Sequence, residues 1–126
     1  MYNIPLFDIN FDDEEKMAIN KTLDSKWIST GPKCQEFEEL FCKKLDINFS
    51  LTTSSCTSSL HMSLLALDIK NNDEVLVPSL TFAATANVVK YVGAKPVFCD
   101  VISIQNPTID PDDIIRKITN KTKAII

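Results

Sequence analysis

Short apolar segments alternate with helix-like segments along the C-terminal half of the chain, and this alternation limits the fold more than any other feature. The segments 73–78, 95–101 and 122–126 have strand character, and helical patterns over 81–92 and about 111–118 separate them. Strands that alternate with helices in this way lie parallel in one sheet, with the helices packed on its faces. The sequence therefore predicts an α/β fold with a mostly parallel sheet and helices on both faces.

The N-terminal part of the chain is predicted to be mainly helical. Acidic residues complement the dipole of a helix predicted over about 12–24, and Pro32 is placed to begin a second helix over about 33–45. Residues 47–53 alternate well enough for another strand, and the polar cluster 54–58 then leads into an apolar helix. A helix that is apolar on most sides is typical of a segment packed inside a larger body.

Charge and composition exclude several classes of protein. A net charge of −4 and a pI near 4.9, with scattered basic residues, argue against binding to nucleic acid or to an anionic membrane. No secretory signal or membrane-spanning stretch is visible in the sequence, so we expect a cytoplasmic protein. The sequence has two glycines, Gly31 and Gly93, which are too few for the glycine-rich phosphate loops of nucleotide-binding proteins. Any phosphate site must therefore use another type of loop.

The cysteines and the single histidine do not form a metal-binding pattern. Four cysteines are present without the Cys-x-x-Cys spacing of zinc sites, and His61 is the one histidine of the sequence. We therefore predict no metal site, and we expect free thiols, as in a reducing compartment. The cysteines are Cys34, Cys42, Cys56 and Cys99.

Residues 54–59, Ser-Ser-Cys-Thr-Ser-Ser, form the segment with the clearest chemical character. They lie between a predicted strand and an apolar helix, so their backbone N–H groups are expected at a helix N-terminus, where anions bind. The hydroxyls of Thr57 and Ser58 add donors for a phosphate oxygen. Serine and threonine also cap helices, so the spacing alone leaves a plain cap as the alternative. A second polar segment with an aromatic residue, 78–82, follows the next strand, and neighbouring strand ends are where such sheets bind ligands.

Seven short motifs stand in a fixed order along the chain, and the set they form is more specific than any one of them. Together they resemble the DegT/DnrJ/EryC1/StrS family of sugar aminotransferases, which depend on pyridoxal phosphate. The motifs are Ile-Pro at 4–5, Trp-Ile-Ser-Thr-Gly-Pro at 27–32, Ser-Ser-Cys-Thr-Ser-Ser-Leu-His at 54–61, Asp-Glu-Val-Leu-Val-Pro-Ser-Leu-Thr-Phe at 73–82, Ala-Thr-Ala-Asn at 84–87, Val-Gly-Ala-Lys-Pro-Val-Phe-Cys-Asp-Val at 92–101 and Thr-Lys-Ala-Ile-Ile at 122–126.

The resemblance covers nearly the whole chain and implies a fold and a set of cofactor contacts. The implied fold is the N-terminal part of the large domain of the aspartate-aminotransferase-like fold, also called fold type I. Thr57 and Ser58 match the pair that receives the phosphate of pyridoxal phosphate, and Phe82 matches the aromatic residue that lies against its pyridine ring. Cys56 belongs to the same cofactor-binding loop, at a position where many relatives carry glycine or alanine.

The resemblance also divides the chain. Residues 1–32 match an N-terminal arm with a helix and an active-site loop, and residues 33–126 match an incomplete N-terminal portion of the domain that binds the cofactor. Within the arm, Thr30 and Gly31 match a loop near the substrate and the dimer interface. The resemblance implies that the complete protein is a homodimer.

The activity implied by the family is transfer of an amino group, usually from glutamate, to a keto group on a nucleotide-linked sugar. Such transfer requires a lysine that forms a Schiff base with the cofactor. In the family this lysine lies beyond the position that matches Ile126, so we assign no catalytic residue and expect these 126 residues to be inactive alone. The apolar final strand also predicts that the chain is part of a larger fold, because a buried parallel strand is normally covered by the segment that follows it.

Three alternatives remain open at the level of sequence. In the first, the chain is an independent small domain whose edge strand ends it. In the second, it is a non-catalytic remnant, or an interaction module that binds phosphate or pyridoxal phosphate without the Schiff-base lysine. In the third, it is an unrelated flavodoxin-like binder with the same geometry at its strand ends.

Overall fold

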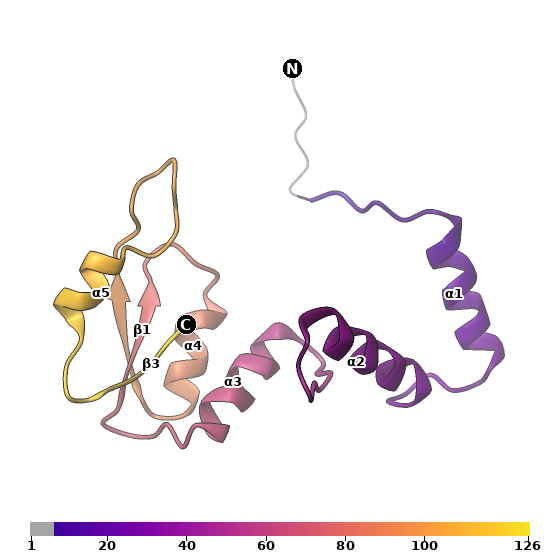
Figure 1. The fold of residues 1–126 in the computed structure, drawn as a ribbon, viewed down its shortest axis with the longest axis horizontal. Helices are drawn as coiled ribbons and strands as arrows, with labels where there is room; N and C mark the ends of the chain where they lie inside the picture. The colour runs from indigo at the N-terminus through magenta and orange to yellow at the C-terminus, as the bar shows by residue number, and fades with distance from the viewer. Residues whose placement is uncertain (1–6) are drawn as a thin grey trace. The chain divides into compact units, whose positions relative to one another are not determined.

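The computed structural model describes residues 7–126, so the Ile-Pro motif at 4–5 lies outside the described part of the chain. The chain divides into two compact units, Met1–Thr52 and Thr53–Ile126. The first unit carries helices α1 and α2, and the second carries the sheet and the remaining helices (Figure 1).

The first unit has two helices at the predicted positions. Helix α1 (Asp13–Asp24) begins with a capping box, in which the Asp12 side chain accepts a hydrogen bond from the helix and the Glu15 side chain accepts one from the Asp12 N–H. Helix α2 (Pro32–Leu45) begins at its proline, as predicted, and ends where Asp46 adopts the left-handed conformation. Neither helix has a buried residue, and the apolar stripe of α2, formed by Phe37, Leu40, Phe41 and Leu45, is exposed.

The predicted strand over 47–53 is wrong, because this segment forms side-chain contacts with α2 instead of joining a sheet. The Ser50 hydroxyl donates to the Glu38 carbonyl oxygen at 2.8 Å, and the Thr52 N–H donates to the Glu38 carboxylate at 2.7 Å. The bond from the Thr52 N–H, and then a bond from the Thr52 hydroxyl at 2.7 Å, lower the pKa of the Glu38 carboxyl. The alternation of polar and apolar residues in segment 47–53 therefore arises because one side of this segment faces α2.

The second unit is built on a three-stranded parallel sheet, as predicted. Strand β1 (Glu74–Pro78) lies in the centre, between β2 (Lys95–Cys99) and β3 (Thr122–Ile125). The pairing of β1 with β2 is regular, whereas the pairing with β3 shifts register after Glu74. Thr122 pairs with Glu74, and Ala124 pairs with Val75, so Lys123 is an extra residue in β3.

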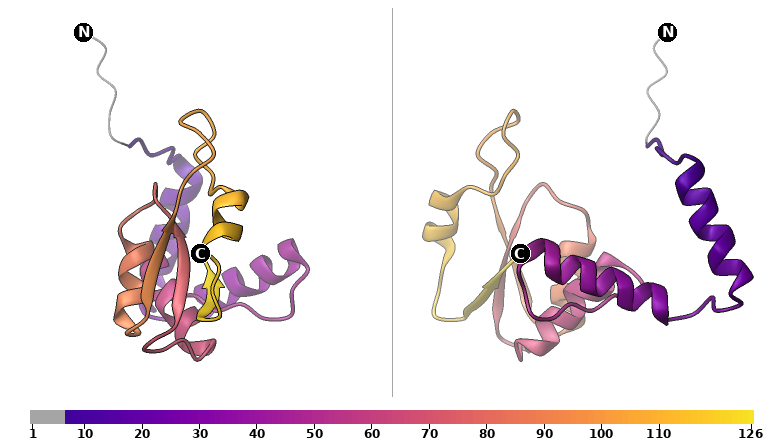
Figure 2. Two further views of the ribbon diagram at one scale, coloured as in Figure 1. Left: turned by 90° about the vertical axis from the view of Figure 1, so that its left-hand side faces the viewer. Right: turned by 45° about the vertical axis from the view of Figure 1, so that its right-hand side comes forward.

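Helices cover both faces of this sheet. Helix α4 (Ala84–Tyr91) lies on one face and α5 (Pro111–Lys117) on the other (Figures 1 and 2). Helix α3 (Cys56–Ala66) packs beside α4. Val75 and Val77 of β1 join the apolar cluster that α3 and α4 cover, whereas Leu76, fully buried between them, points to the opposite face. The cluster consists of Leu64, Ile69, Val75, Val77, Val88, Val89 and Ala94.

The described residues contain no helix long and apolar enough to cross a bilayer. Within the same part of the chain, no group of three or more histidine, cysteine or acidic residues is placed to hold a metal ion. The four cysteines are free thiols, and burial raises the pKa of Cys99.

Candidate functional site

The Ser/Thr cluster lies at the N-terminus of α3, but it is more helical than the sequence suggests. The helix begins at Cys56, because the Ser55 side chain accepts a hydrogen bond from the Ser58 N–H at 3.1 Å and caps the helix. Thr57 and Ser58 therefore lie in the first turn, not in a loop. The cap left open as an alternative is present, and it is provided by Ser55.

The first turn of α3 has the geometry of an anion site. The first intrahelical bond of this end runs from the Ser59 N–H to the Ser55 carbonyl at 3.1 Å, so the N–H groups of Cys56 and Thr57 have no partner within the helix. The Ser58 hydroxyl lies 3.0 Å from the Ser55 hydroxyl and 3.1 Å from that of Ser54. Backbone and hydroxyl donors thus gather at the positive end of the helix dipole.

The segment after β1 holds Phe82 by its backbone and leaves its ring free. The Phe82 carbonyl accepts a hydrogen bond from the Thr85 N–H at 3.0 Å, and the Thr81 and Thr85 hydroxyls lie 2.9 Å apart. At the other end of the segment, the Ser79 N–H donates to the Cys99 carbonyl at 2.7 Å. The Phe82 residue is 81% exposed, so its ring is available to stack on a flat ligand.

The Ser/Thr cluster and the Phe82 segment begin neighbouring helices. Helices α3 and α4 pack together, and the rings of His61 and Tyr91 meet edge to face with centroids 5.6 Å apart. Sequence reasoning assigned no role to His61, because nothing in a single sequence shows that residue 91 lies beside it. The contact fixes the relative placement of the two helices that begin at the candidate site.

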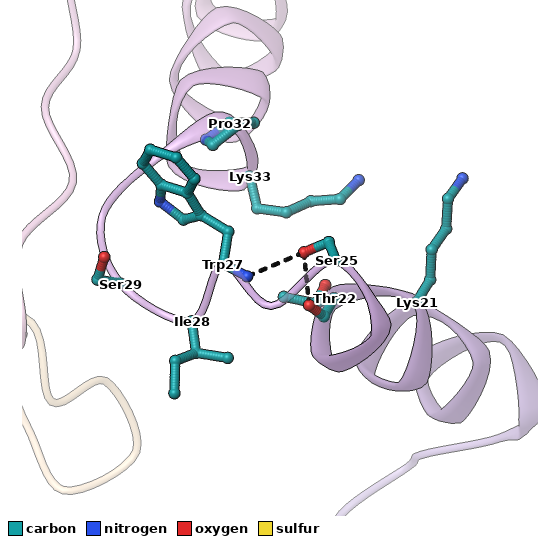
Figure 3. A pocket seen from close by; sticks show the side chains of 8 residues that line it. All are labelled: Lys21, Thr22, Ser25, Trp27, Ile28, Ser29, Pro32 and Lys33. Atoms are coloured by element: carbon teal, nitrogen blue, oxygen red, sulfur yellow. Dashed lines mark hydrogen bonds between the residues drawn. The ribbon is translucent and has the colours of Figure 1, made fainter.

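Thr30 and Gly31 lie in the first unit, in a loop organised by Trp27. The Trp27 indole N–H donates to the Thr30 carbonyl at 3.0 Å. A Cβ atom at Gly31 would lie 2.0 Å from that indole nitrogen, so the loop requires glycine for close approach. Beside it is a pocket of about 450 Å³ (Figure 3), lined by Lys21, Thr22, Ser25, Trp27, Ile28, Ser29, Pro32 and Lys33.

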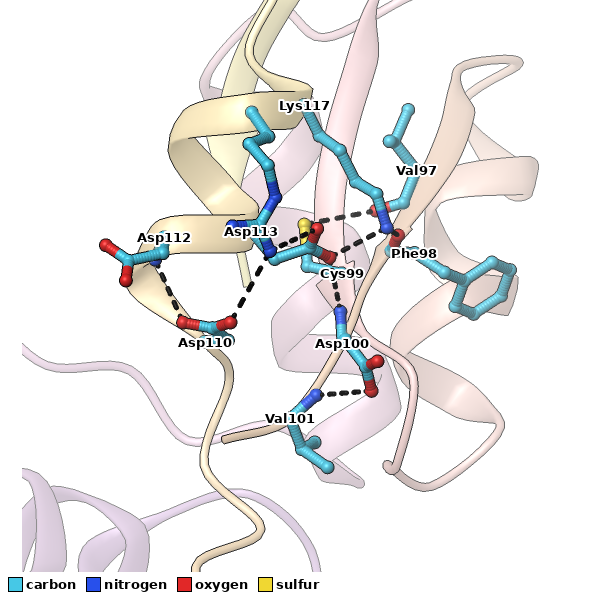
Figure 4. A network of polar contacts seen from close by, with 10 residues as sticks. Val97, Phe98, Cys99, Asp100, Val101, Asp110, Asp112, Asp113 and Lys117 are labelled. Atoms are coloured by element: carbon cyan, nitrogen blue, oxygen red, sulfur yellow. Dashed lines mark hydrogen bonds and ion pairs between the residues drawn. The ribbon is translucent and has the colours of Figure 1, made fainter. Parts of the chain in front are cut away.

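A buried carboxylate between β2 and α5 was missed by sequence reasoning. Asp113 is 6% exposed and accepts hydrogen bonds from the Asp100 N–H at 2.6 Å and from Arg116 at 3.1 Å (Figure 4). Its other partner is Lys117, at 2.7 Å, which also donates to the Phe98 carbonyl at 2.7 Å. Lys117 and then the Asp100 N–H lower the pKa of Asp113 from 3.8 to about 2.

The sequence carried one signal for this network. Asp113 and Lys117 stand four residues apart, which places them on one face of a helix, in the favourable order for an ion pair. The Asp100 N–H has no such signal in the sequence, because that partner lies on another element and is a backbone group. Asp110 caps α5 as its position before Pro111 suggests, by accepting from the Asp112 N–H at 2.9 Å.

Known proteins share both the sequence and the fold of this chain. It is 43% identical over 129 residues to GDP-perosamine synthase of Escherichia coli O157:H7, an alignment that covers 100% of this chain and 35% of that protein. An uncharacterized protein of Methanocaldococcus jannaschii is 45% identical over 98% of this chain and 32% of its own length. The chain thus spans about a third of the length of the curated relatives it matches.

Solved structures agree with these relatives. The putative sugar aminotransferase Spr1654 of Streptococcus pneumoniae, in its PLP form, matches with a TM-score of 0.87 and 35% identity over 98% of this chain and 31% of that one. The E. coli GDP-4-keto-6-deoxy-D-mannose-3-dehydratase with bound hydrated PLP matches with a TM-score of 0.86 and 29% identity, over 99% of this chain and 33% of that one. The expected aspartate-aminotransferase-like fold is therefore confirmed.

A family model also matches almost the whole chain. The matched residues are 10–126, which include both the first turn of α3 and the Phe82 segment. The motifs quoted from the sequence lie within this range, apart from the Ile-Pro start. The chain belongs to the DegT/DnrJ/EryC1/StrS aminotransferase family.

Proposed function

We propose that this chain forms part of a pyridoxal-phosphate-dependent aminotransferase that acts on a nucleotide-linked keto sugar. The observation that carries the proposal is the first turn of α3, which contains Thr57 and Ser58 and has backbone N–H groups without an intrahelical partner. The neighbouring helix α4 follows a segment with the exposed ring of Phe82. Family membership and relatives named as a GDP-perosamine synthase and a sugar aminotransferase support the substrate class.

The residues at this site suit the two chemically distinct parts of the cofactor. A phosphate dianion suits a helix N-terminus whose first N–H groups have no intrahelical partner. A flat heteroaromatic ring suits an exposed phenyl face, and the Phe82 backbone is already held by Thr85. Cys56 is exposed at the start of the same turn, and its side chain is small enough to leave the backbone accessible.

In this proposal the chain binds and orients the cofactor. Bound pyridoxal phosphate supplies the carbonyl carbon and the electron-withdrawing ring through which an amino group passes between substrates. Thr57 and Ser58 donate hydrogen bonds to the phosphate, and Phe82 limits the tilt of the ring. No residue of this chain is assigned to proton transfer. The residues 1–32 form an arm whose Thr30 and Gly31 loop lies near the sugar in a homodimer, and glutamate is the amino donor.

The proposal is tested by binding and by turnover in the full polypeptide that the gene encodes. We expect saturable binding of pyridoxal phosphate in an absorbance titration, with inorganic phosphate as a competitor. Ser58→Ala should weaken that binding by roughly tenfold or more, because a hydrogen bond to a charged group is lost. Ser63→Ala is the matched control, since Ser63 is exposed on the same helix but lies beyond the first turn.

Turnover then separates the competing functions. Mass spectrometry of a nucleotide-linked keto sugar incubated with glutamate should show a carbonyl oxygen replaced by an amino group. Loss of water from the sugar without amino transfer would place the protein with the dehydratase that shares its fold. Cofactor binding without any turnover would favour the non-catalytic module, and failure to bind pyridoxal phosphate would contradict the proposed function itself.

A further inference from the structure

One peptide group of the second unit is hydrogen-bonded at both ends. This is the group between Cys99 and Asp100, at the carboxyl end of β2. Its carbonyl accepts from the Ser79 N–H at 2.7 Å, and its N–H donates to the Asp113 carboxylate at 2.6 Å (Figure 4). In the next peptide group, the Asp100 carbonyl accepts from the Asp110 N–H at 2.9 Å. The end of β2 is therefore fixed between α5 and the first residue after β1.

Ser79, whose N–H donates to the carbonyl of this peptide group, begins the segment that carries Phe82. Ser79 follows the last residue of β1, and three residues later the Phe82 carbonyl is held by the Thr85 N–H at 3.0 Å. The segment is thus attached at its start to β2 and at its end to α4. Of these two attachments, the one at Ser79 uses the peptide group whose N–H donates to Asp113.

The Asp113 carboxylate is well suited to hold that peptide group still. It is nearly buried, and it is also bound by Lys117 at 2.7 Å and by Arg116 at 3.1 Å. Lys117 also donates to the Phe98 carbonyl at 2.7 Å, one peptide group earlier in the same strand. A carboxylate fixed by several charge-assisted bonds has little freedom to rotate away from the Asp100 N–H.

We infer that Asp113 is a positioning residue for the cofactor ring, acting through the Cys99–Asp100 peptide group and Ser79 on the segment that carries Phe82. The cofactor in this inference comes from the proposed function. The structural link from Asp113 to Ser79 does not depend on it. Asp113 does not touch the cofactor site itself. Its role is to keep Phe82 at a fixed height above the sheet.

The structural part is tested by hydrogen exchange of individual amides in the full polypeptide without cofactor. Asp113→Ala should speed exchange of the Asp100 and Ser79 N–H groups by about tenfold, because the shared peptide group loses its fixed acceptor. Asp113→Asn keeps an acceptor oxygen and should restore part of the protection. Asp112→Asn is the matched control, an exposed neighbour on the same helix, and should leave both amides unchanged.

The functional part uses two probes of different size. Asp113→Ala should raise the dissociation constant of pyridoxal phosphate by about threefold to tenfold, the range expected for coupling between linked segments. Binding of inorganic phosphate alone should stay unchanged, since the first turn of α3 is untouched. Should Asp113→Ala fail to fold, Asp113→Asn serves in its place, with a smaller shift in the same direction.

The outcomes separate this inference from the proposed function. If the unsubstituted protein does not bind pyridoxal phosphate, the proposed function fails, while faster Ser79 exchange in the variants still supports the structural link. If that protein binds the cofactor and the Asp113 variants match Asp112→Asn in Ser79 exchange and in affinity, the positioning role is overturned. An equal loss of affinity for phosphate and for the cofactor would also overturn it, because that pattern indicates general damage.

Discussion

The two units of the molecule differ in where their apolar side chains lie. In the second unit, Val75, Leu76 and Val77 of the central strand are completely buried, with helices on both faces. In the first unit, α1 and α2 bury no residue, and side chains such as Leu40 remain more than half exposed. The second unit is therefore held by packing, whereas the first depends on caps, ion pairs and the Trp27 loop.

This difference shows what each kind of sequence pattern can establish. Amphipathic spacing and capping signals predict that a helix forms, and both helices of the first unit form as predicted. Such signals do not reveal whether the apolar stripe is covered within the same chain. The run Val75-Leu76-Val77 in β1 carries that information directly, because a strand segment without polar alternation is buried on both faces.

The largest expected effect concerns the core of the second unit. Leu76→Ala should lower the free energy of unfolding by about 3 kcal/mol, since a fully buried leucine is lost and a cavity remains. Leu40→Ala in the first unit should change it by less than about 0.5 kcal/mol. Denaturant unfolding curves of both variants measure the contrast. Equal losses would break the comparison, because they would mean that the α2 stripe is buried in solution.

The two glycines give a second contrast, with one in each unit. Gly31→Ala should cost about 1–3 kcal/mol, because the new methyl group collides with the Trp27 indole, and the emission of this single tryptophan should shift. Gly93→Ala has space around it but a φ of 77°, so it should cost about 1–2 kcal/mol through backbone strain alone. Fluorescence distinguishes them, since Gly93→Ala should leave the emission unchanged.

Helix caps provide a smaller effect that sharpens the same comparison. Asp12→Ala and Ser55→Ala each remove a cap and should cost about 1 kcal/mol. In α1 the loss should appear as faster hydrogen exchange in the first turn only, since no core couples that helix to others. In α3 it should also lower the midpoint of global unfolding. Identical behaviour of the two helices would argue that both units unfold together.

The last effect is a dependence of stability on pH that is confined to acidic solution. The pKa of Asp113 is lowered from 3.8 to about 2, so its stabilising contribution is complete above 3.8 and is lost as the pH falls toward about 2. Asp113→Asn should flatten the stability profile over this interval in thermal unfolding. In the first unit, Lys33 lowers the pKa of Glu36. Because this ion pair is exposed, its contribution to stability should change less with pH and should be lost in high salt.

Much of the fold follows from the sequence, because its signals are local. The three strands and the helices between them lie close to their predicted ranges, and Asp110 and Pro111 mark the start of α5. The strand predicted over 47–53 failed because Glu38 of α2 satisfies that segment's polar groups, and such a long-range partner has no local signature. Of the candidate site, only the features that depend on neighbouring residues in the sequence could be predicted.

Within the site, residue types were easier to predict than their surroundings. The hydroxyl cluster was found from composition, but its division into a cap at Ser55 and a first turn at Thr57 and Ser58 depends on where the helix begins. The need for glycine at Gly31 and the burial of Asp113 both arise from neighbours in space. The roles of Phe82 and Thr30 came from family resemblance and remain predictions.

The register shift in β3 also determines where this chain can change in length. Lys123 is exposed and lies between residues that pair with Glu74 and Val75, so removing it would leave the pairs of Thr122, Ala124 and Ile125 intact. Removing Ala124 instead would bring a lysine opposite Val75, on the face that α3 and α4 cover. A one-residue deletion in this strand is therefore tolerable at Lys123 and damaging at Ala124. Relatives should be aligned in this strand by which residues pair with β1, and not by the number of residues.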